Sequence, residues 1–132
     1  MLCPSCKSPL DPSEYDIFSD NLSEPVIETL FKKTSNSNCD TCGGLGTLNP
    51  KPYIEFREVT TEDLEFIRNE NWDGWRHFLV KNGVEFVEQK ILTDVLGGDL
   101  CAIEKASEVR TAVEENKILM AGQKLSGDTD EL

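Results

Sequence analysis

The sequence has few of the residue patterns that mark common enzyme sites. Its 132 residues contain one histidine, His77, and a lone histidine is more often structural than catalytic. Neither a His-Glu-x-x-His motif nor a calcium-binding loop is present. The glycine-rich stretches at residues 43–46 and 97–98 lack the Lys-Ser/Thr ending of a phosphate-binding loop. We therefore expect no catalytic residues and a protein that is not an enzyme.

Long hydrophobic runs are also missing. No stretch approaches the ~20 apolar residues of a membrane-spanning helix, so we expect no membrane association. The first residues, Met-Leu-Cys-Pro, lack the basic region and apolar run of a secretory signal peptide. The expected location is the cytoplasm, or the host cytoplasm or virion if the protein is viral.

Basic residues are scarce relative to acidic ones. The chain has 13 Lys and Arg against 25 Asp and Glu, which gives a formal net charge of −12. A surface of this charge repels phosphate backbones, so direct nucleic-acid binding is disfavoured. The charge either serves solubility alone or favours a protein partner with a basic surface.

What the sequence does contain is two cysteine pairs of identical spacing. Cys3 and Cys6 flank Pro-Ser, and Cys39 and Cys42 flank Asp-Thr. Two C-x-x-C turns supply four thiolates, which form the closed tetrahedral set that a structural zinc prefers. We therefore predict a zinc site with these four cysteines as its ligands.

The same four cysteines are compatible with chemistry other than zinc binding. Thiolates also accept iron, so the choice of metal stays open. Two disulfides would need an oxidising compartment. The first pair is similar to a glutaredoxin active site, but that chemistry needs a strand before the motif and a helix after it. Here only Met1 and Leu2 precede the pair, and Pro9 and Pro12 follow it.

The second pair continues into a glycine-rich stretch. Residues 39–46 read Cys-Asp-Thr-Cys-Gly-Gly-Leu-Gly, which matches C-x-x-C-x-G-x-G. This pattern resembles one repeat of the cysteine-rich zinc domain of J-protein cochaperones. The resemblance covers about eight residues, and it implies zinc binding at Cys39 and Cys42.

The length indicates one domain, or one small domain with a metal subsite. We predict an α+β fold with a small sheet, three to four helices and an N-terminal zinc site of the zinc-ribbon or treble-clef type. The expected divisions are a zinc-binding subdomain at residues 1–50 that encloses one short helix, an α+β body at 51–125 and an acidic tail at 126–132.

Hydrophobic spacing and capping signals place the individual elements. They predict helices over residues 24–34, 60–69, 73–82 and 100–117. Thr60 and Asp63 have the spacing of a capping box. Alternation predicts two strands, at residues 53–59 and 84–91, that would pair in the small sheet. Residues 118–121 would extend the last helix or add a contact, and the tail would be disordered.

Trp72 and Trp75 are the candidate partner-binding residues. Core burial is the default for tryptophan, but tryptophan is also enriched among residues that dominate binding energy. Trp72 is the better candidate because it falls in a break between two expected helices. The fifth cysteine, Cys101, is expected to pack as a small apolar residue.

These features lead to one function hypothesis and two alternatives. The first is a non-enzymatic, zinc-stabilised interaction module that acts as adaptor, regulator or inhibitor of a basic or nucleic-acid-binding protein. The second is a structural subunit of a multi-chain assembly such as a bacteriophage tail or baseplate, since the composition resembles that of small bacteriophage-encoded proteins. The third is a zinc-ribbon accessory of a nucleic-acid enzyme.

Overall fold

The computed structural model describes residues 1–34 and 38–117, and these form an α+β fold. The elements are β1 (Ser8–Pro9), the 3-10 helix η1 (Pro12–Ile17), α1 (Glu24–Ile27), β2 (Phe31–Lys32), α2 (Thr61–Arg68), α3 (Trp72–Lys81), α4 (Val87–Leu96) and a helix over residues 106–117. No helix in this part of the chain has the length and apolar character needed to cross a membrane. The predictions for residues 118–132 lie outside the described residues.

The prediction of three to four helices is wrong, because the described residues contain six. One missed helix is η1, which starts with Pro12 and has a capping box between Asp11 and Glu14. The other is α4, where a strand was predicted over residues 84–91. The apolar residues Val87, Ile91 and Val95 recur every four positions, which is helical spacing, and this periodicity outweighs the short alternation at residues 84–87.

The small sheet is also made of residues other than those predicted. β1 and β2 pair antiparallel, with Ser8 opposite Lys32 and Pro9 opposite Phe31. The helix predicted over residues 24–34 stops at Ile27, because the following residues turn back to form β2. The chain over residues 53–59 is extended but has no strand partner among the described residues.

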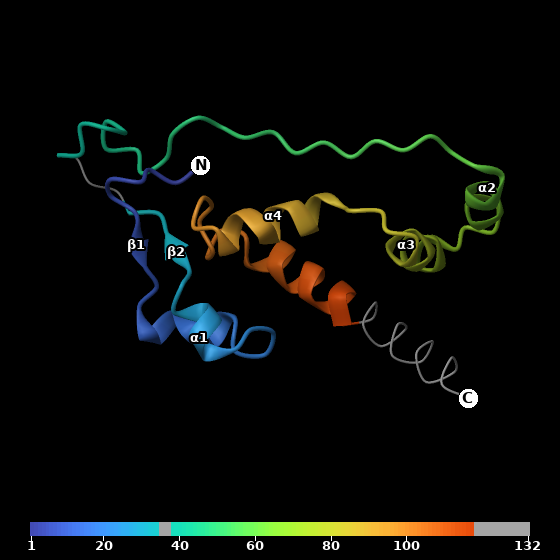
Figure 1. Cartoon of the computed structure of the whole chain (residues 1–132), viewed down its shortest axis with the longest axis horizontal. Coiled ribbons are helices and arrows are strands. Elements are labelled where there is room, and N and C mark those ends of the chain that lie inside the picture. Colours follow the sequence, from blue (N-terminus) through green and yellow to red (C-terminus); the bar gives the residue numbers. More distant parts are fainter. Residues whose placement is uncertain (35–37, 118–132) are drawn as a thin grey trace.

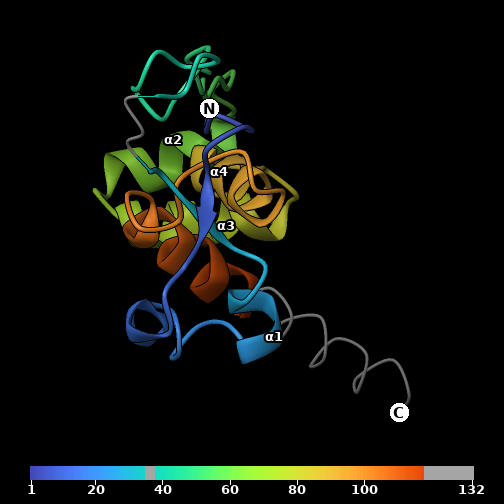
Figure 2. The ribbon, with the colours of Figure 1, turned by 90° about the vertical axis from the view of Figure 1, so that its left-hand side faces the viewer.

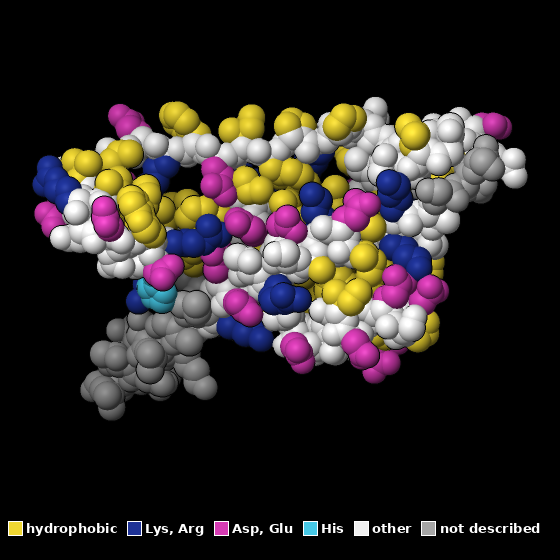
Figure 3. Space-filling model, turned by 180° about the vertical axis from the view of Figure 1, so that it is seen from behind, with side chains coloured by type: hydrophobic (Ala, Val, Ile, Leu, Met, Phe, Trp, Pro, Cys, Tyr) yellow, Lys and Arg dark blue, Asp and Glu magenta, His cyan; other side chains and the backbone are white. Residues whose placement is uncertain are grey.

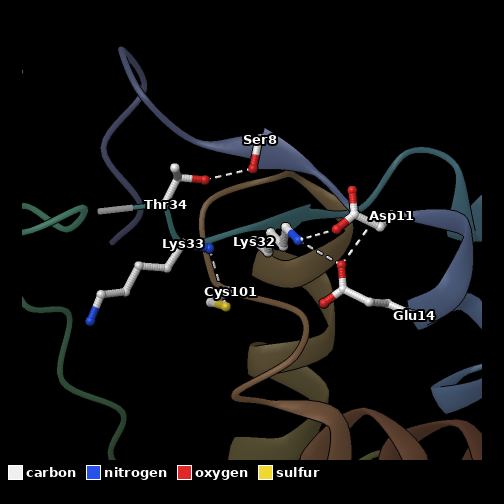
Figure 4. A network of polar contacts seen from close by, with 7 residues as sticks. All are labelled: Ser8, Asp11, Glu14, Lys32, Lys33, Thr34 and Cys101. Carbon is white, nitrogen blue, oxygen red and sulfur yellow. Dashed lines mark hydrogen bonds and ion pairs between the residues drawn. The ribbon is translucent and has the colours of Figure 1, made fainter. Parts of the chain in front are cut away.

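Polar contacts hold the β1–β2 hairpin onto η1 (Figure 4). Lys32 Nζ lies 2.8 Å from a carboxylate oxygen of Asp11 and 2.7 Å from one of Glu14. These contacts raise the pKa of Lys32 and lower the pKa of both carboxyl groups. On the neighbouring strand, the hydroxyls of Ser8 and Thr34 lie 2.6 Å apart. The hairpin and the residues around it therefore act as one braced unit.

The N-terminal segment forms a layer against the C-terminal helices (Figure 2). The hydrophobic core joins residues from both regions: Leu10, Phe18, Ile27 and Leu30 on one side, and Ile91, Leu92, Val95, Leu100, Ala102, Val109 and Ala112 on the other. Since neither set buries its apolar surface alone, the first 34 residues and residues 87–117 stabilise each other.

A long connector leads from the N-terminal segment to the opposite end of the molecule (Figure 1). It ends at α2, where the predicted capping box of Thr60 and Asp63 is confirmed. The side chain of Asp63 is fully buried and accepts hydrogen bonds from Arg57, Thr60 and Trp75. The Arg57 guanidinium and the amide of Thr60 hold the pKa of Asp63 far below its usual range. This carboxylate therefore fixes the end of the connector to α2 and α3.

The core can be tested by truncating Leu30, which is 0% exposed. Leu30→Ala removes apolar atoms between the two layers, so we expect it to lower the free energy of unfolding by about 2–5 kcal/mol. Urea denaturation of the metal-loaded protein measures this change. The matched control is Leu45→Ala at a position that is 68% exposed, where the expected change is within about 0.5 kcal/mol. Equal effects at the two positions would contradict the core assignment.

Candidate metal centre

The two cysteine pairs meet at one end of the molecule. The sulfur atoms of Cys3, Cys6, Cys39 and Cys42 all lie within 4.8 Å of one another. The distance is 3.8 Å between the sulfurs of Cys3 and Cys39, and 3.6 Å between those of Cys6 and Cys42. A tetrahedron with metal–sulfur bonds of about 2.3 Å separates its sulfurs by about 3.8 Å. The four-sulfur cluster therefore has the dimensions required to hold a metal ion.

Short backbone pairing brings the two cysteine turns together. Leu2 forms an antiparallel bridge with Thr47. Beside it, the amide of Cys3 donates to the carbonyl of Gly46 at 2.9 Å, and the amide of Leu48 donates to the carbonyl of Met1 at 2.7 Å. These bonds place residues 1–3 alongside residues 46–48. The first cysteine pair adjoins one of these segments and the second pair adjoins the other, so the pairing brings the two pairs together.

Gly46 shapes the second cysteine turn in two ways. Its amide donates to the sulfur of Cys42 at 3.2 Å, and this bond is the largest cause that lowers the pKa of Cys42 to about 6. Its φ of +79° lies in the left-handed region that favours glycine. A Cβ at this position would lie 2.9 Å from both Lys33 Cγ and the carbonyl oxygen of Thr34. The site therefore needs glycine at residue 46 for backbone conformation and for space.

The four sulfurs differ in their surroundings. Cys3 is 0% exposed and Cys42 is 5% exposed, whereas Cys6 and Cys39 are partly buried. Burial and the neighbouring sulfurs raise the pKa of Cys6 to about 12, in contrast to the lowered pKa of Cys42. Cys42 therefore loses its proton more readily than Cys6. A bound cation would favour the thiolate form of its cysteine ligands.

The metal centre is joined directly to the C-terminal half of the chain. The amide of Leu2 donates to the carbonyl of Asp99 at 2.7 Å. Lys7 Nζ donates to the carbonyl of Gly98 at 2.9 Å and lies 4.2 Å from the centre of the Phe31 ring.

A third link involves the fifth cysteine (Figure 4). The amide of Lys33 donates to the sulfur of Cys101 at 3.3 Å. Cys101 is 7% exposed and is not among the four clustered sulfurs, so its packing agrees with the expectation of a small apolar residue. The segment at residues 98–101 is thus held by residues that flank or follow the metal ligands.

The predicted tryptophans lie away from the metal centre, on α3. Trp72 is 55% exposed, and its ring centre lies 6.2 Å from that of Trp75. Trp75 is partly buried and donates from Nε1 to Asp63 at 3.0 Å, which gives it a structural contact. His77 is exposed and belongs to no group of three or more potential metal ligands among the described residues.

Both tryptophans line a pocket of about 550 Å³. Its other walls come from residues 55–57 of the connector and from residues 84–86, beside α3. Sequence reasoning assigned both of these segments to strands of the sheet and therefore missed the pocket. The alternation of apolar and polar residues at 53–59 was the available signal. It indicated an extended segment, and the structure places residues 55–57 of that segment in the wall of the tryptophan pocket.

Comparison of the chain with protein-family models, curated proteins and solved structures gave no match. The assignment of a metal centre therefore depends on the geometry of the four sulfurs and on their chemistry.

Removing one ligand tests the metal centre. We expect Cys39→Ser to lower the bound metal below one ion per chain and to lower the melting temperature, because three thiolates no longer close a tetrahedral set. Elemental analysis and thermal denaturation, with and without a chelator, measure both effects. Cys101→Ala is the control and should keep one metal ion per chain. Full metal content in Cys39→Ser would contradict the assignment.

Gly46 offers a second test that leaves all four sulfurs in place. Gly46→Ala introduces a Cβ that collides with Lys33 and Thr34, so we expect metal affinity to fall by about 10-fold or more. Gly43→Ala is the matched control, because Gly43 also has a positive φ, of +64°, but has open space around it. Competition with a chromogenic chelator measures both affinities. An equal loss of metal affinity in the two variants would contradict this reasoning. It would show that the positive φ, and not the contact of the new Cβ with Lys33 and Thr34, causes the loss at residue 46.

Proposed function

We propose that this chain is a non-enzymatic, zinc-stabilised protein-interaction module that acts as adaptor, regulator or inhibitor of a basic partner protein. The observation that carries the proposal is the separation of two features. The four-sulfur cluster is a closed ligand set at one end of the molecule, and a pocket lined by aromatic and charged side chains lies elsewhere, beside the exposed Trp72. The first feature suits a structural role, and the second suits binding.

Zinc is the metal that best fits this role. It prefers four tetrahedral ligands in structural sites, and four thiolates leave no open position for water or a substrate. Metal-assisted hydrolysis would need such a position. Metal analysis of freshly purified protein distinguishes zinc from iron, since a ferric tetrathiolate centre is coloured and a zinc centre is not.

The pocket supports a role in protein binding. Trp72, Trp75 and Phe86 contribute aromatic surface, and the 55% exposure of Trp72 leaves much of its indole open to contact. Buried aromatic anchors in such pockets often dominate the binding energy of an interface. The net charge of −12 would accelerate association with a basic partner and would disfavour an acidic one.

A structural subunit of a larger assembly is a second candidate function. It is supported by large apolar side chains that stand exposed on the connector, including Phe56 at 93% and Ile54 at 71% exposure. Co-purification with particles would favour this role over that of a regulator.

Truncation of Trp72 tests the main proposal. We expect Trp72→Ala to weaken capture of the partner from lysate by about 30-fold, the loss typical of a binding hot spot. Quantitative mass spectrometry at several salt concentrations measures capture, which should fall as salt rises because the partner is basic. Leu45→Ala is the control, since Leu45 is exposed but is not one of the residues that line the pocket. Capture that is independent of both Trp72 and salt would contradict the proposal.

A further inference from the structure

The connector between the metal centre and α2 has the properties of a β-strand without a partner. Residues 53–59 read Tyr-Ile-Glu-Phe-Arg-Glu-Val, and they belong to the connector that runs extended along the molecule in Figure 1. In the described part of the chain, none of its backbone amides or carbonyls bonds to another backbone group. Pro52, which has no amide hydrogen, precedes the segment, and Thr60, the N-cap of α2, follows it. An extended edge of this length is a template for pairing with another strand.

The side chains of the connector alternate between two faces. Tyr53 donates from its hydroxyl to Asp94, Glu55 accepts the amide hydrogen of Val87 at 2.7 Å, and Arg57 contacts Asp63 at 3.0 Å. These odd-numbered residues attach the connector to the rest of the molecule. The even-numbered Ile54 and Phe56 are 71% and 93% exposed. Hydrophobic side chains stand along this edge of the molecule (Figure 3).

One edge of the connector backbone is free to pair. In an extended chain, the amide and carbonyl of each residue point to one side, and those of the next residue point to the other side. The carbonyl of Ile54 accepts a hydrogen bond from Lys90 Nζ at 3.1 Å, so the even-numbered edge is partly engaged. Among the described contacts, the odd-numbered edge, with the backbone groups of Tyr53, Glu55, Arg57 and Val59, has no hydrogen-bond partner.

The sequence of the connector is complementary to itself. In an antiparallel pair centred on Phe56, each Glu55 lies opposite Arg57 of the other strand, and Tyr53 lies opposite Val59. Cross-strand pairs of opposite charge stabilise such ladders, as do aromatic pairs. Arg57 binds Asp63 through Nε and Nη2, so its other guanidinium nitrogen remains available for Glu55 of a second chain.

We propose that two copies of this chain form a twofold dimer in which residues 53–59 pair antiparallel, with Phe56 at the symmetry axis. Through the free edge, the backbone of Glu55 in each copy forms a hydrogen-bonded pair with the backbone of Arg57 in the other copy. Phe56 then faces Phe56 of the second copy in a non-hydrogen-bonded pair, where the two side chains are closest. The contact is isologous, so it closes at two copies. It does not require a partner protein or an occupied Trp72 pocket.

The dimer is expected to be weak. A two-stranded contact buries less surface than the roughly 1,600 Å² of a standard stable interface. Two chains of charge −12 also repel each other. We expect a dissociation constant of roughly 10–100 μM, which is weaker than the micromolar limit of interfaces of standard size.

Sedimentation equilibrium of the full, metal-loaded chain from 5 to 500 μM tests the association. Wild-type protein should shift from monomer to dimer, and Phe56→Asp should weaken the dimer by at least 10-fold, because it places two carboxylates at the axis. Since Phe56 is 93% exposed, the melting temperature at 5 μM, where we expect wild type to be mostly monomeric, should not change. Leu45→Asp, at another exposed apolar position, is the control and should dimerise as wild type does. A wild-type chain that stays monomeric throughout, or a dimer that tolerates Phe56→Asp, would overturn the proposal.

Disulfide trapping tests the register. The Cα atoms at position 56 would lie about 4.5 Å apart across the axis, which suits a disulfide. Phe56→Cys should therefore cross-link to itself under mild oxidation by oxidised glutathione. Two Ile54→Cys chains should not, because their Cα atoms would lie about 13 Å apart. A mixture of Ile54→Cys and Glu58→Cys chains should cross-link again. Peptide mapping assigns each disulfide, and self-linking through residue 54 would overturn the register.

Discussion

The convergence of four sulfurs is the constraint on which the N-terminal half of this protein depends. Cys3 and Cys39 are 36 positions apart, and the loop between them contains η1, α1 and both strands. Closing a loop of this size with a cross-link removes about 4 kcal/mol of unfolded-state entropy. Each of the enclosed elements is too short to be stable alone. A metal ion would therefore supply much of the order that these elements cannot generate from their own hydrogen bonds.

The metal centre and the hydrophobic core depend on each other through a few contacts. Residues 2 and 7 hold the carbonyls of Asp99 and Gly98, next to the segment that enters the core. Leu10, Phe18 and Leu30, from the N-terminal segment, belong to the same hydrophobic cluster as residues of α4 and of the helix over residues 106–117. The N-terminal segment is thus fixed at one end by sulfur and at the other by apolar contact. This arrangement lets a chain with a net charge of −12 remain compact with a core of modest size.

Local signals in the sequence predicted local features well. The C-x-x-C pairs indicated the four sulfurs that the structure brings together, and the Thr60–Asp63 spacing gave the start of α2. The predicted break at Trp72 separates α2 from α3, but Trp72 itself is the first residue of α3. The errors arose where tertiary contacts decide the outcome. Phe31 has helical spacing with Ile27, but pairing with Pro9 and the bond from Ala102 draw it into β2. No local pattern shows that residues 53–59 lack a strand partner among residues 1–34 and 38–117, because that depends on where α4 packs.

The backbone hydrogen bonds that join Leu2 to Asp99 and Phe31 to Ala102 form only after the C-terminal half of the chain has been synthesised. Cys42 is the last of the four cysteines to be synthesised. Asp99 is added to the chain 57 residues later. At about 5–20 residues per second, the ribosome needs roughly 3–11 s to add that stretch. If the four cysteines bind an ion, the nascent chain could bind it while the helices that complete the core are still being made. During that interval the ion would keep Leu10, Phe18 and Leu30 in the vicinity of the sites that these helices later cover.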